Sequence, residues 1–174
     1  MKILLFFIIA TVAVAHNYTL VNACTGNIPL VDVKRHMAAV FHDHIYNVNL
    51  NRPIAIYNGT DVVLNQTSSL QTDLIIAAID TITVNNSTHC NWENIFDMAL
   101  TPSTMHSGIH YLFLFYDSHW CGDNPYRAAS LFRMHHVIVP IAIGPQTNMM
   151  DMYHIMGPCQ KPRCYNMRDY LVIN

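Results

Sequence analysis

Residues 109–117 read I-H-Y-L-F-L-F-Y-D, a run of apolar and aromatic residues that ends in an aspartate. A run without polar alternation is typical of a strand that is buried on both faces of a sheet. A second run of this kind, V-I-V-P-I-A-I-G, occupies residues 137–144. Its Pro140 predicts an edge strand or a bulge, because proline has no N–H to donate within a central ladder. The two runs therefore predict the core of an α/β sheet.

The remaining segments alternate as such a sheet requires. A strand is predicted at 18–21, an amphipathic helix over 30–46, and a β-hairpin around Asn58-Gly59. Further helices are predicted over 70–79 (capped by Ser68 or Ser69, with Leu70, Leu74, Ile75, Ala78 and Ile79 inward), 91–100, 125–134 and 148–156, with a last short strand near Tyr170. Together they predict a doubly wound α/β fold: a mostly parallel central sheet with one antiparallel hairpin and helices on both faces.

The first fifteen residues have the features of a signal peptide. Lys2 is positive, residues 3–12 are apolar, and Ala13 and Ala15 give a small-x-small cleavage pattern. We expect a signal peptide over 1–15, a single domain over 16–174, and a secreted, extracellular protein; a signal anchor is the alternative interpretation. No later stretch is long and apolar enough to span a bilayer. The net charge of −2 argues against a nucleic-acid partner, which requires clustered basic residues.

The chain contains five N-glycosylation sequons, at Asn17, Asn58, Asn65, Asn85 and Asn86. With a signal peptide, this density predicts a glycoprotein. Modified asparagines must face water, so we expect these positions in loops or at strand ends. The two adjacent sequons are not expected to be occupied together.

The five cysteines would meet an oxidising environment outside the cell, where disulfides form. Because five is odd, at least one thiol is free or pairs with another chain. Cys159 and Cys164 stand five residues apart across a proline-containing turn, and we predict a structural disulfide between them. The sequence alone does not fix the partners of Cys24, Cys90 and Cys121.

Histidines and a polar loop are the other candidates for chemistry. The pairs His42-x-His44 and His135-His136 point their side chains apart on a helix, so they do not predict a metal site. Residues 117–123 (D-S-H-W-C-G-D) contain acid–base and nucleophilic groups, but the chain has no G-x-S-x-G elbow. A polar loop at the end of a core strand is favoured, with no catalytic residue and no cofactor.

The order of these elements resembles the von Willebrand factor type A (VWA) domain over nearly all of residues 18–172. Residues 68–82 look like the second helix of that family, 111–120 like the strand that carries its aspartate, and 128–144 like a helix that leads to a strand ending in glycine. The resemblance implies a binding module with a metal-ion-dependent adhesion site. In that site a D-x-S-x-S turn, a threonine and an aspartate hold Mg²⁺ or Mn²⁺, which are hard cations that prefer oxygen ligands.

Carried over position by position, this metal site is degenerate. Asn22 replaces the first aspartate, Cys24 and Gly26 replace the two serines, Cys90 replaces the threonine, and Asp117 matches. Thiols and a glycine are poor substitutes for oxygen ligands, so we expect no high-affinity Mg²⁺. The same alignment implies that Cys24 and Cys90 lie on adjacent loops and can form a disulfide in place of the metal. Cys121 is the rival partner, and otherwise the free or intermolecular thiol.

The resemblance thus implies a secreted, glycosylated binding or adhesion module that contacts an extracellular protein or matrix ligand without metal or catalysis. Its binding face would comprise residues 22–27, 89–92 and 117–124, with Trp92, His119 and Trp120 as candidate contact residues. Two alternatives remain open. One is a small secreted hydrolase using Asp117 and loop histidines; the other is an inert structural module that forms a disulfide-linked homodimer.

Overall fold

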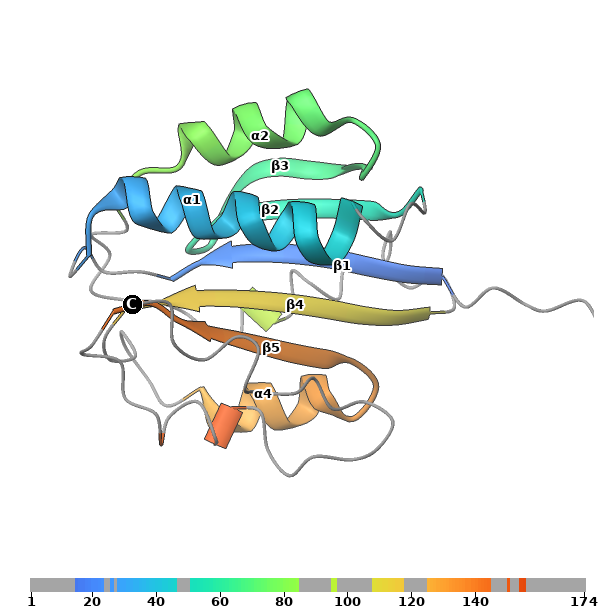
Figure 1. Cartoon of the computed structure of the whole chain (residues 1–174). Coiled ribbons are helices and arrows are strands. Elements are labelled where there is room, and N and C mark those ends of the chain that lie inside the picture. Colours follow the sequence, from blue (N-terminus) through green and yellow to red (C-terminus); the bar gives the residue numbers. More distant parts are fainter. Residues whose placement is uncertain are drawn as a thin grey trace, which may run out of the picture.

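The protein is built around a five-stranded sheet with the strand order β3-β2-β1-β4-β5 (Figure 1). The computed structural model describes residues 15–23, 26, 28–46, 51–84, 95–96, 108–117, 125–144, 150 and 154–155. The strands are β1 (Ala15–Asn22), β2 (Pro53–Asn58), β3 (Asp61–Ser68), β4 (Gly108–Tyr116) and β5 (Val137–Ala142). Among the described pairs, β2 and β3 are antiparallel, and β1–β2, β1–β4 and β4–β5 are parallel. The predicted mostly parallel sheet with one antiparallel hairpin is confirmed.

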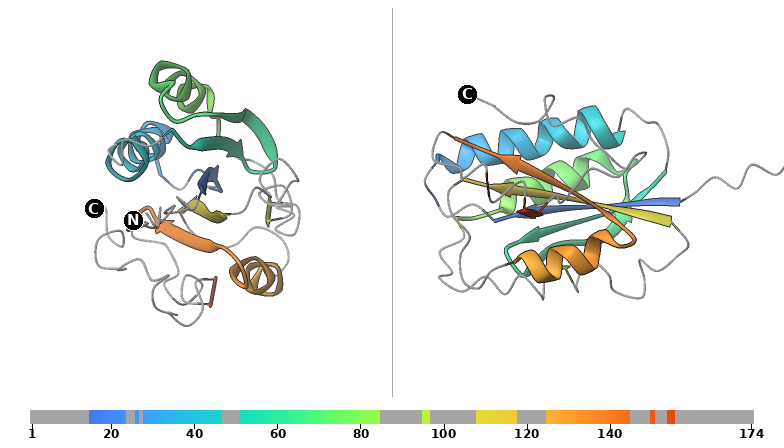
Figure 2. Two further views of the ribbon diagram at one scale, coloured as in Figure 1. Left: turned by 90° about the vertical axis from the view of Figure 1, so that its right-hand side faces the viewer. Right: turned by 90° about the horizontal axis from the view of Figure 1, so that it is seen from below.

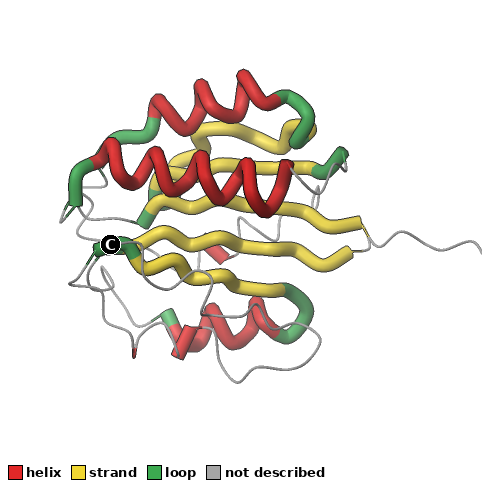
Figure 3. Tube along the Cα trace, in the orientation of Figure 1, coloured by secondary structure: helices red, strands yellow, loops and turns green. Residues whose placement is uncertain are grey.

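Helices cover both faces of this sheet, as expected (Figures 2 and 3). Helix α1 (Leu30–Val40) continues into the π-helical segment η1 (Phe41–Tyr46), and both pack with α2 (Thr72–Thr81) against one face. Helix α4 (Tyr126–Arg133) packs against the other face. Within the described residues, no helix is long and apolar enough to cross a membrane.

The core consists of two apolar layers, one on each side of the sheet. Alternate residues of β4 supply both: Phe113 and Phe115 belong to the layer under α1 and α2, whereas Leu112 and Leu114 belong to the layer under α4. All four are fully buried. This confirms that the run at 109–116 is buried on both faces.

The helix predicted over 30–46 is confirmed, but its last six residues widen into the π-helical register. The rings of Phe41 and Tyr46 lie 6.1 Å apart between centroids. Residues five apart are brought into line by a π-helix, so this ring contact accompanies the wider turn.

Helix α2 begins two residues later than predicted, and neither serine caps it. The Ser69 hydroxyl instead accepts a hydrogen bond from the backbone N–H of Arg52 at 3.0 Å, and the Ser68 hydroxyl donates to Asn51 Oδ1 at 2.6 Å. Both hydroxyls therefore tie the turn to the start of β2. The predicted inward positions of Leu70 and Leu74 are wrong, since these side chains are 51% and 48% exposed.

Candidate functional site

Four strand ends meet at one edge of the sheet. Because β1 is parallel to β2 and β4, and β4 is parallel to β5, their carboxyl ends lie side by side (Figure 1). The connection from β1 leads to β2 on one side while β4 lies on the other, so the boundary of β1 and β4 is the topological switch point at which α/β proteins bind ligands. Asn22 is the last residue of β1, and Asp117 directly follows β4. The structure thus brings two of the predicted site residues to neighbouring strand ends.

The side chain of Asn22 is completely buried and forms part of a neutral hydrogen-bond network. Its Nδ2 donates to Asn58 Oδ1 at 2.8 Å and to the carbonyl of Thr83 at 3.4 Å. Nδ2 of Asn58 in turn donates to Thr83 Oγ1 at 3.1 Å. The network therefore joins the end of β1 to the end of β2 and to the chain that leaves α2.

The carboxylate of Asp117 is also buried, at 1% exposure, and accepts a hydrogen bond from the backbone N–H of Gly26 at 3.0 Å. Gly26 has a φ of +96°, and a Cβ atom there would lie 3.0 Å from Val84 Cγ1. A serine at this position would be strained by its backbone and crowded by Val84. The turn is therefore shaped around a glycine, and the serine found in the metal site of VWA domains does not fit at this position.

A second glycine holds the neighbouring strand end close to the same turn. Gly144, which ends the segment after β5, has a φ of +88°, and a Cβ atom would lie 2.7 Å from Ile28 Cγ2. The backbone after β5 thus packs directly on the segment that leads into α1. Any larger residue at 144 must push these two segments apart.

A large part of the predicted site lies outside the described residues. This applies to all five cysteines and to the candidate contact residues, namely Cys24, Cys90, Cys121, Cys159, Cys164, Trp92, His119 and Trp120. It applies equally to the sequons at Asn85 and Asn86. The disulfide, free-thiol and contact predictions stay predictions.

The described part of the donor set, which leaves out Cys24 and Cys90, does not fit the Mg²⁺ or Mn²⁺ site of VWA domains. Of the positions carried over, Asp117 supplies a carboxylate, Gly26 supplies no side chain, and Asn22 directs its amide nitrogen at protein acceptors. Magnesium and manganese require several oxygen ligands in near-octahedral geometry. In the described part of the chain, no group of three or more His, Cys, Asp or Glu side chains is placed to hold a metal ion.

A buried histidine beneath α4 was not identified by the sequence patterns. His110 is 1% exposed; its Nε2 lies 2.7 Å from Thr19 Oγ1, and its backbone N–H donates to His136 Nδ1 at 3.3 Å. Burial, with a smaller contribution from His136, lowers the pKa of His110 to about 3. The signal in the sequence was its position inside a run that is buried on both faces, which forces the side chain at 110 into a core layer.

The three described sequon asparagines differ in their surroundings. Asn17 lies within β1 and is 4% exposed, so it does not meet the requirement that a modified asparagine faces water. Asn58 stands at a strand end as expected, but its amide belongs to the network with Asn22. Asn65 faces water as expected, but it lies within β3 and not in a loop or at a strand end, so that part of the expectation is wrong.

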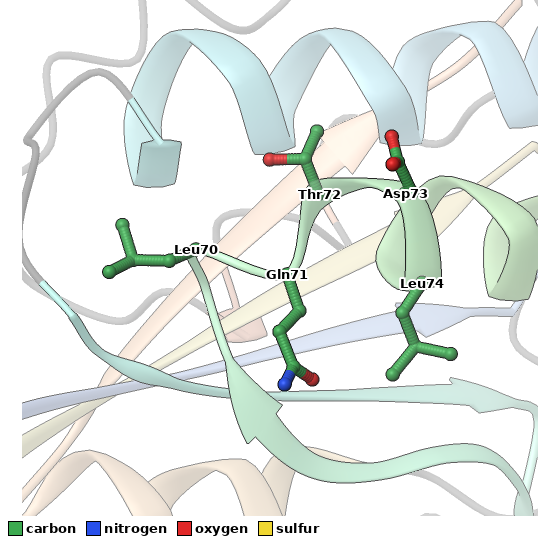
Figure 4. A pocket seen from close by; sticks show the side chains of 5 residues that line it. All are labelled: Leu70, Gln71, Thr72, Asp73 and Leu74. Atoms are coloured by element: carbon green, nitrogen blue, oxygen red, sulfur yellow. The ribbon is translucent and has the colours of Figure 1, made fainter.

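A shallow hollow of about 560 Å³ lies elsewhere, at the amino-terminal end of α2 (Figure 4). It is lined by Leu70, Gln71, Thr72, Asp73 and Leu74. Because β3 ends beside the start of β2, this hollow is at the opposite edge of the sheet from Asn22 and Asp117. It adds nothing to the candidate site.

In the part of the chain that the structure describes, the strand order, the single antiparallel pair and the helices on both faces define a VWA-like domain. No protein-family model and no curated protein sequence matches the chain, but solved VWA structures do. One is proximal thread matrix protein 1 (PTMP1) of the mussel byssus, with a zinc-occupied metal-ion-dependent adhesion site: TM-score 0.66, 16% identity, 91% of this chain and 41% of that chain.

Two further structures give the same result. They are the von Willebrand factor type A protein of Catenulispora acidiphila (TM-score 0.54, 14% identity, 82% of this chain and 36% of that chain) and the SpRpn10 VWA domain (TM-score 0.56, 13% identity, 83% and 81%). The chain thus spans less than half the length of the byssus and Catenulispora chains. At these identities the likeness establishes the fold, and the predicted VWA-like fold is confirmed.

Proposed function

We propose that the protein is a secreted, glycosylated VWA-like module that binds another extracellular protein or a matrix component directly, without a bound metal ion and without catalysis. The observation that carries this proposal is the internal pairing of polar groups at the carboxyl edge of the sheet. The amide of Asn22 is bonded to Asn58 and Thr83, and the carboxylate of Asp117 is bonded to Gly26. Groups that would face a cation in the family here hold loops together.

The rim of the same edge offers apolar surface for a protein partner. Val31, in the first turn of α1, is 69% exposed, and Val84, after α2, is 38% exposed. Asp32, which follows Val31 in α1, is paired with Arg35 at 2.8 Å. Interface centres are apolar and depleted of free charges, so this rim suits direct contact with an apolar or aromatic patch on the partner.

The extracellular location rests on the signal-peptide pattern and the sequons. The likeness to PTMP1, which is named as a thread matrix protein, agrees with a matrix ligand. It concerns the fold, and the ligand of this chain is inferred from its own surface.

The environment of Asp117 favours a binding module over the hydrolase alternative. A general acid or base must reach the substrate, within hydrogen-bond distance or through one water. The Asp117 carboxylate is buried and already accepts the Gly26 N–H. The Asp117 carboxylate is thus placed to hold the turn at Gly26 in position.

The test is binding of the secreted full chain to extracellular matrix laid down by cultured cells, with Mg²⁺ or with excess EDTA. We expect equal binding in both, and a loss of about tenfold or more when Val31→Asp is combined with Val84→Asp. Leu131→Asp is the matched control, because Leu131 is 60% exposed but lies on α4. Binding abolished by EDTA contradicts the metal-free proposal, and an equal loss in the control contradicts the proposed face.

A further inference from the structure

Strand β3 ends the described sheet on one side, so half of its backbone hydrogen-bonding groups face away from β2. Such an edge is a template for pairing with another chain, and proteins commonly protect it with charges or bulges. β3 carries one charged residue, Asp61, and exposes Val62 at 56%. Charge therefore gives this edge little protection.

The pairing of β3 with β2 is irregular at two places, at positions 65–66 and again at Val63. Ile54 pairs with Thr67 but Ile56 pairs with Leu64, so β3 has one more residue than β2 between these pairs. The extra residue falls at positions 65–66, and a bulge re-aims the side chains that it contains.

The amide of Asn65 is arranged for modification at its nitrogen. The side chain is exposed, and Oδ1 accepts a hydrogen bond from the backbone N–H of Gln66 at 2.8 Å. This contact holds the oxygen against the backbone. No hydrogen bond from Asn65 Nδ2 is found within the described residues, in contrast to Nδ2 of Asn58, which donates to Thr83.

The other two described sequons conflict with the fold. A glycan on Asn17 would have to leave a strand from a position that is 4% exposed. A glycan on Asn58 would replace a proton of the Nδ2 group that bonds to Thr83 Oγ1, next to the buried amide of Asn22. Of these three sequons, only that of Asn65 can carry a glycan without disturbing the structure.

We propose that Asn65, in the sequon Asn65-Gln66-Thr67, carries an N-linked glycan that shields the β3 edge from pairing with other chains. In the modification, Asn65 Nδ2 forms a C–N bond to the anomeric carbon of a lipid-linked oligosaccharide diphosphate. The C–O bond to the diphosphate breaks, the lipid diphosphate leaves, and the amide proton passes to a base of the glycosylating transferase. The inference rests on the proposed secretion.

The site is tested by expressing the full chain in cultured animal cells, collecting it from the medium and removing glycans with peptide N-glycosidase F in ¹⁸O-water. Peptide mass spectrometry is expected to find ¹⁸O-labelled aspartate at position 65 in most molecules and unmodified Asn17 and Asn58. Asn65→Gln should remove this label. Thr67→Ser retains the sequon, so the label at position 65 should remain. Thr60→Ala removes the Asn58 sequon and should leave the label at position 65 unchanged.

Two kinds of failure are distinguishable. A chain that reaches the medium with Asn65 unmodified, or with a glycan on Asn17 or Asn58, overturns the assignment and leaves secretion intact. A chain that stays in the cytosol without any glycan overturns both the assignment and the proposed secretion.

Shielding is tested on the folded, secreted protein, so that failure to fold does not intervene. On protein made with high-mannose glycans, trimming with endoglycosidase H leaves one sugar on Asn65 and creates no carboxylate there, and it is expected to raise the share of oligomers severalfold in sedimentation velocity. Val62→Lys should restore the monomer after deglycosylation, because a lysine on an edge strand opposes pairing. Leu131→Lys, which adds the same charge at an exposed position of α4, should not. A deglycosylated protein that sediments like the untreated protein overturns the shielding role.

Discussion

Lowering the pH from 7 to 5 is expected to destabilise the protein through His110. Its imidazole is 1% exposed beneath α4, and burial lowers its pKa to about 3, against an ordinary value of 6.5. At pH 7 the ring is neutral in the folded chain and mostly neutral in the unfolded chain. As the pH falls through 6.5 the unfolded chain binds a proton and the folded chain does not. Stability is therefore lost as the pH falls, until the pH approaches 3.

The magnitude follows from linkage between proton binding and folding. A histidine that is protonated only in the unfolded chain lowers the free energy of unfolding by about 1.4 kcal/mol per pH unit, once the pH is well below 6.5. Allowing for incomplete titration near pH 6.5, His110 alone accounts for about 2 kcal/mol between pH 7 and pH 5. This is a large share of the roughly 5–15 kcal/mol that stabilise an ordinary domain.

Urea unfolding at both pH values measures the effect in the wild type and in His110→Gln. Glutamine can still hydrogen-bond to Thr19 Oγ1 but does not titrate, so the wild type should lose about 2 kcal/mol more than the variant. His36, whose pKa burial also lowers, is present in both proteins and cancels in the difference. His42→Gln, at an exposed position of η1, is the matched control and should retain the wild-type pH dependence. A His110→Gln protein whose stability falls as steeply as that of the wild type would refute the reasoning.

Three further predictions concern the carboxyl edge of the sheet. In urea titration, Gly144→Ala should lower the free energy of unfolding by about 1–3 kcal/mol, because residue 144 has a positive φ and an added Cβ meets Ile28. Gly59→Asn is the control: residue 59 lies in a hairpin with a φ of +61°, which asparagine tolerates, so the free energy of unfolding should fall much less. Asp117→Ala leaves the Gly26 N–H without this acceptor and should cost about 1–3 kcal/mol; unchanged stability would contradict the structural role of the carboxylate. Excess Mg²⁺, Mn²⁺ or Zn²⁺ should shift the melting temperature by less than about 1 °C, since only a ligand that binds the folded chain stabilises it. A rise of several degrees would contradict the metal-free proposal.

The elements that could be predicted from the sequence are those whose burial follows from the residues within the segment itself. The apolar runs of β4 and β5 identify buried strands without knowledge of their neighbours. Pro140 predicts an edge strand or a bulge, and the strand order places β5 at an edge of the described sheet. The start of α2 could not be predicted in this way, because Ser69 can bond equally well to a helix or to a distant strand. In the structure, the Ser69 hydroxyl accepts a hydrogen bond from the backbone N–H of Arg52, seventeen residues earlier in the chain.

In the candidate site, too, some features follow from the local sequence and others depend on contacts between distant segments. The positions of Asn22 and Asp117 follow from the ends of two predicted strands. The partnership of Asn22 with Asn58 depends on the register of β1 against β2, which pairs these residues directly, and periodicity does not determine register between parallel strands. The role of Thr83 depends on where the chain leaves α2. The sequence feature that indicates this pairing is an asparagine at the end of each of the two strands.

The amide at position 22 and the departure of this edge from the metal-binding residues of VWA domains have one physical explanation. A carboxylate there would be an acceptor facing Asn58 Oδ1 at 2.8 Å and the Thr83 carbonyl at 3.4 Å, and it would need a cation to offset their repulsion; the amide supplies its own donor. Asn22→Asp should therefore lower the free energy of unfolding at pH 7 by about 1–3 kcal/mol in urea titrations with EDTA. Rotation of the Asn58 amide would relieve the first contact but leave the Thr83 carbonyl against a buried anion. Equal stability of Asn22→Asp and the wild type would show that the network does not depend on the amide.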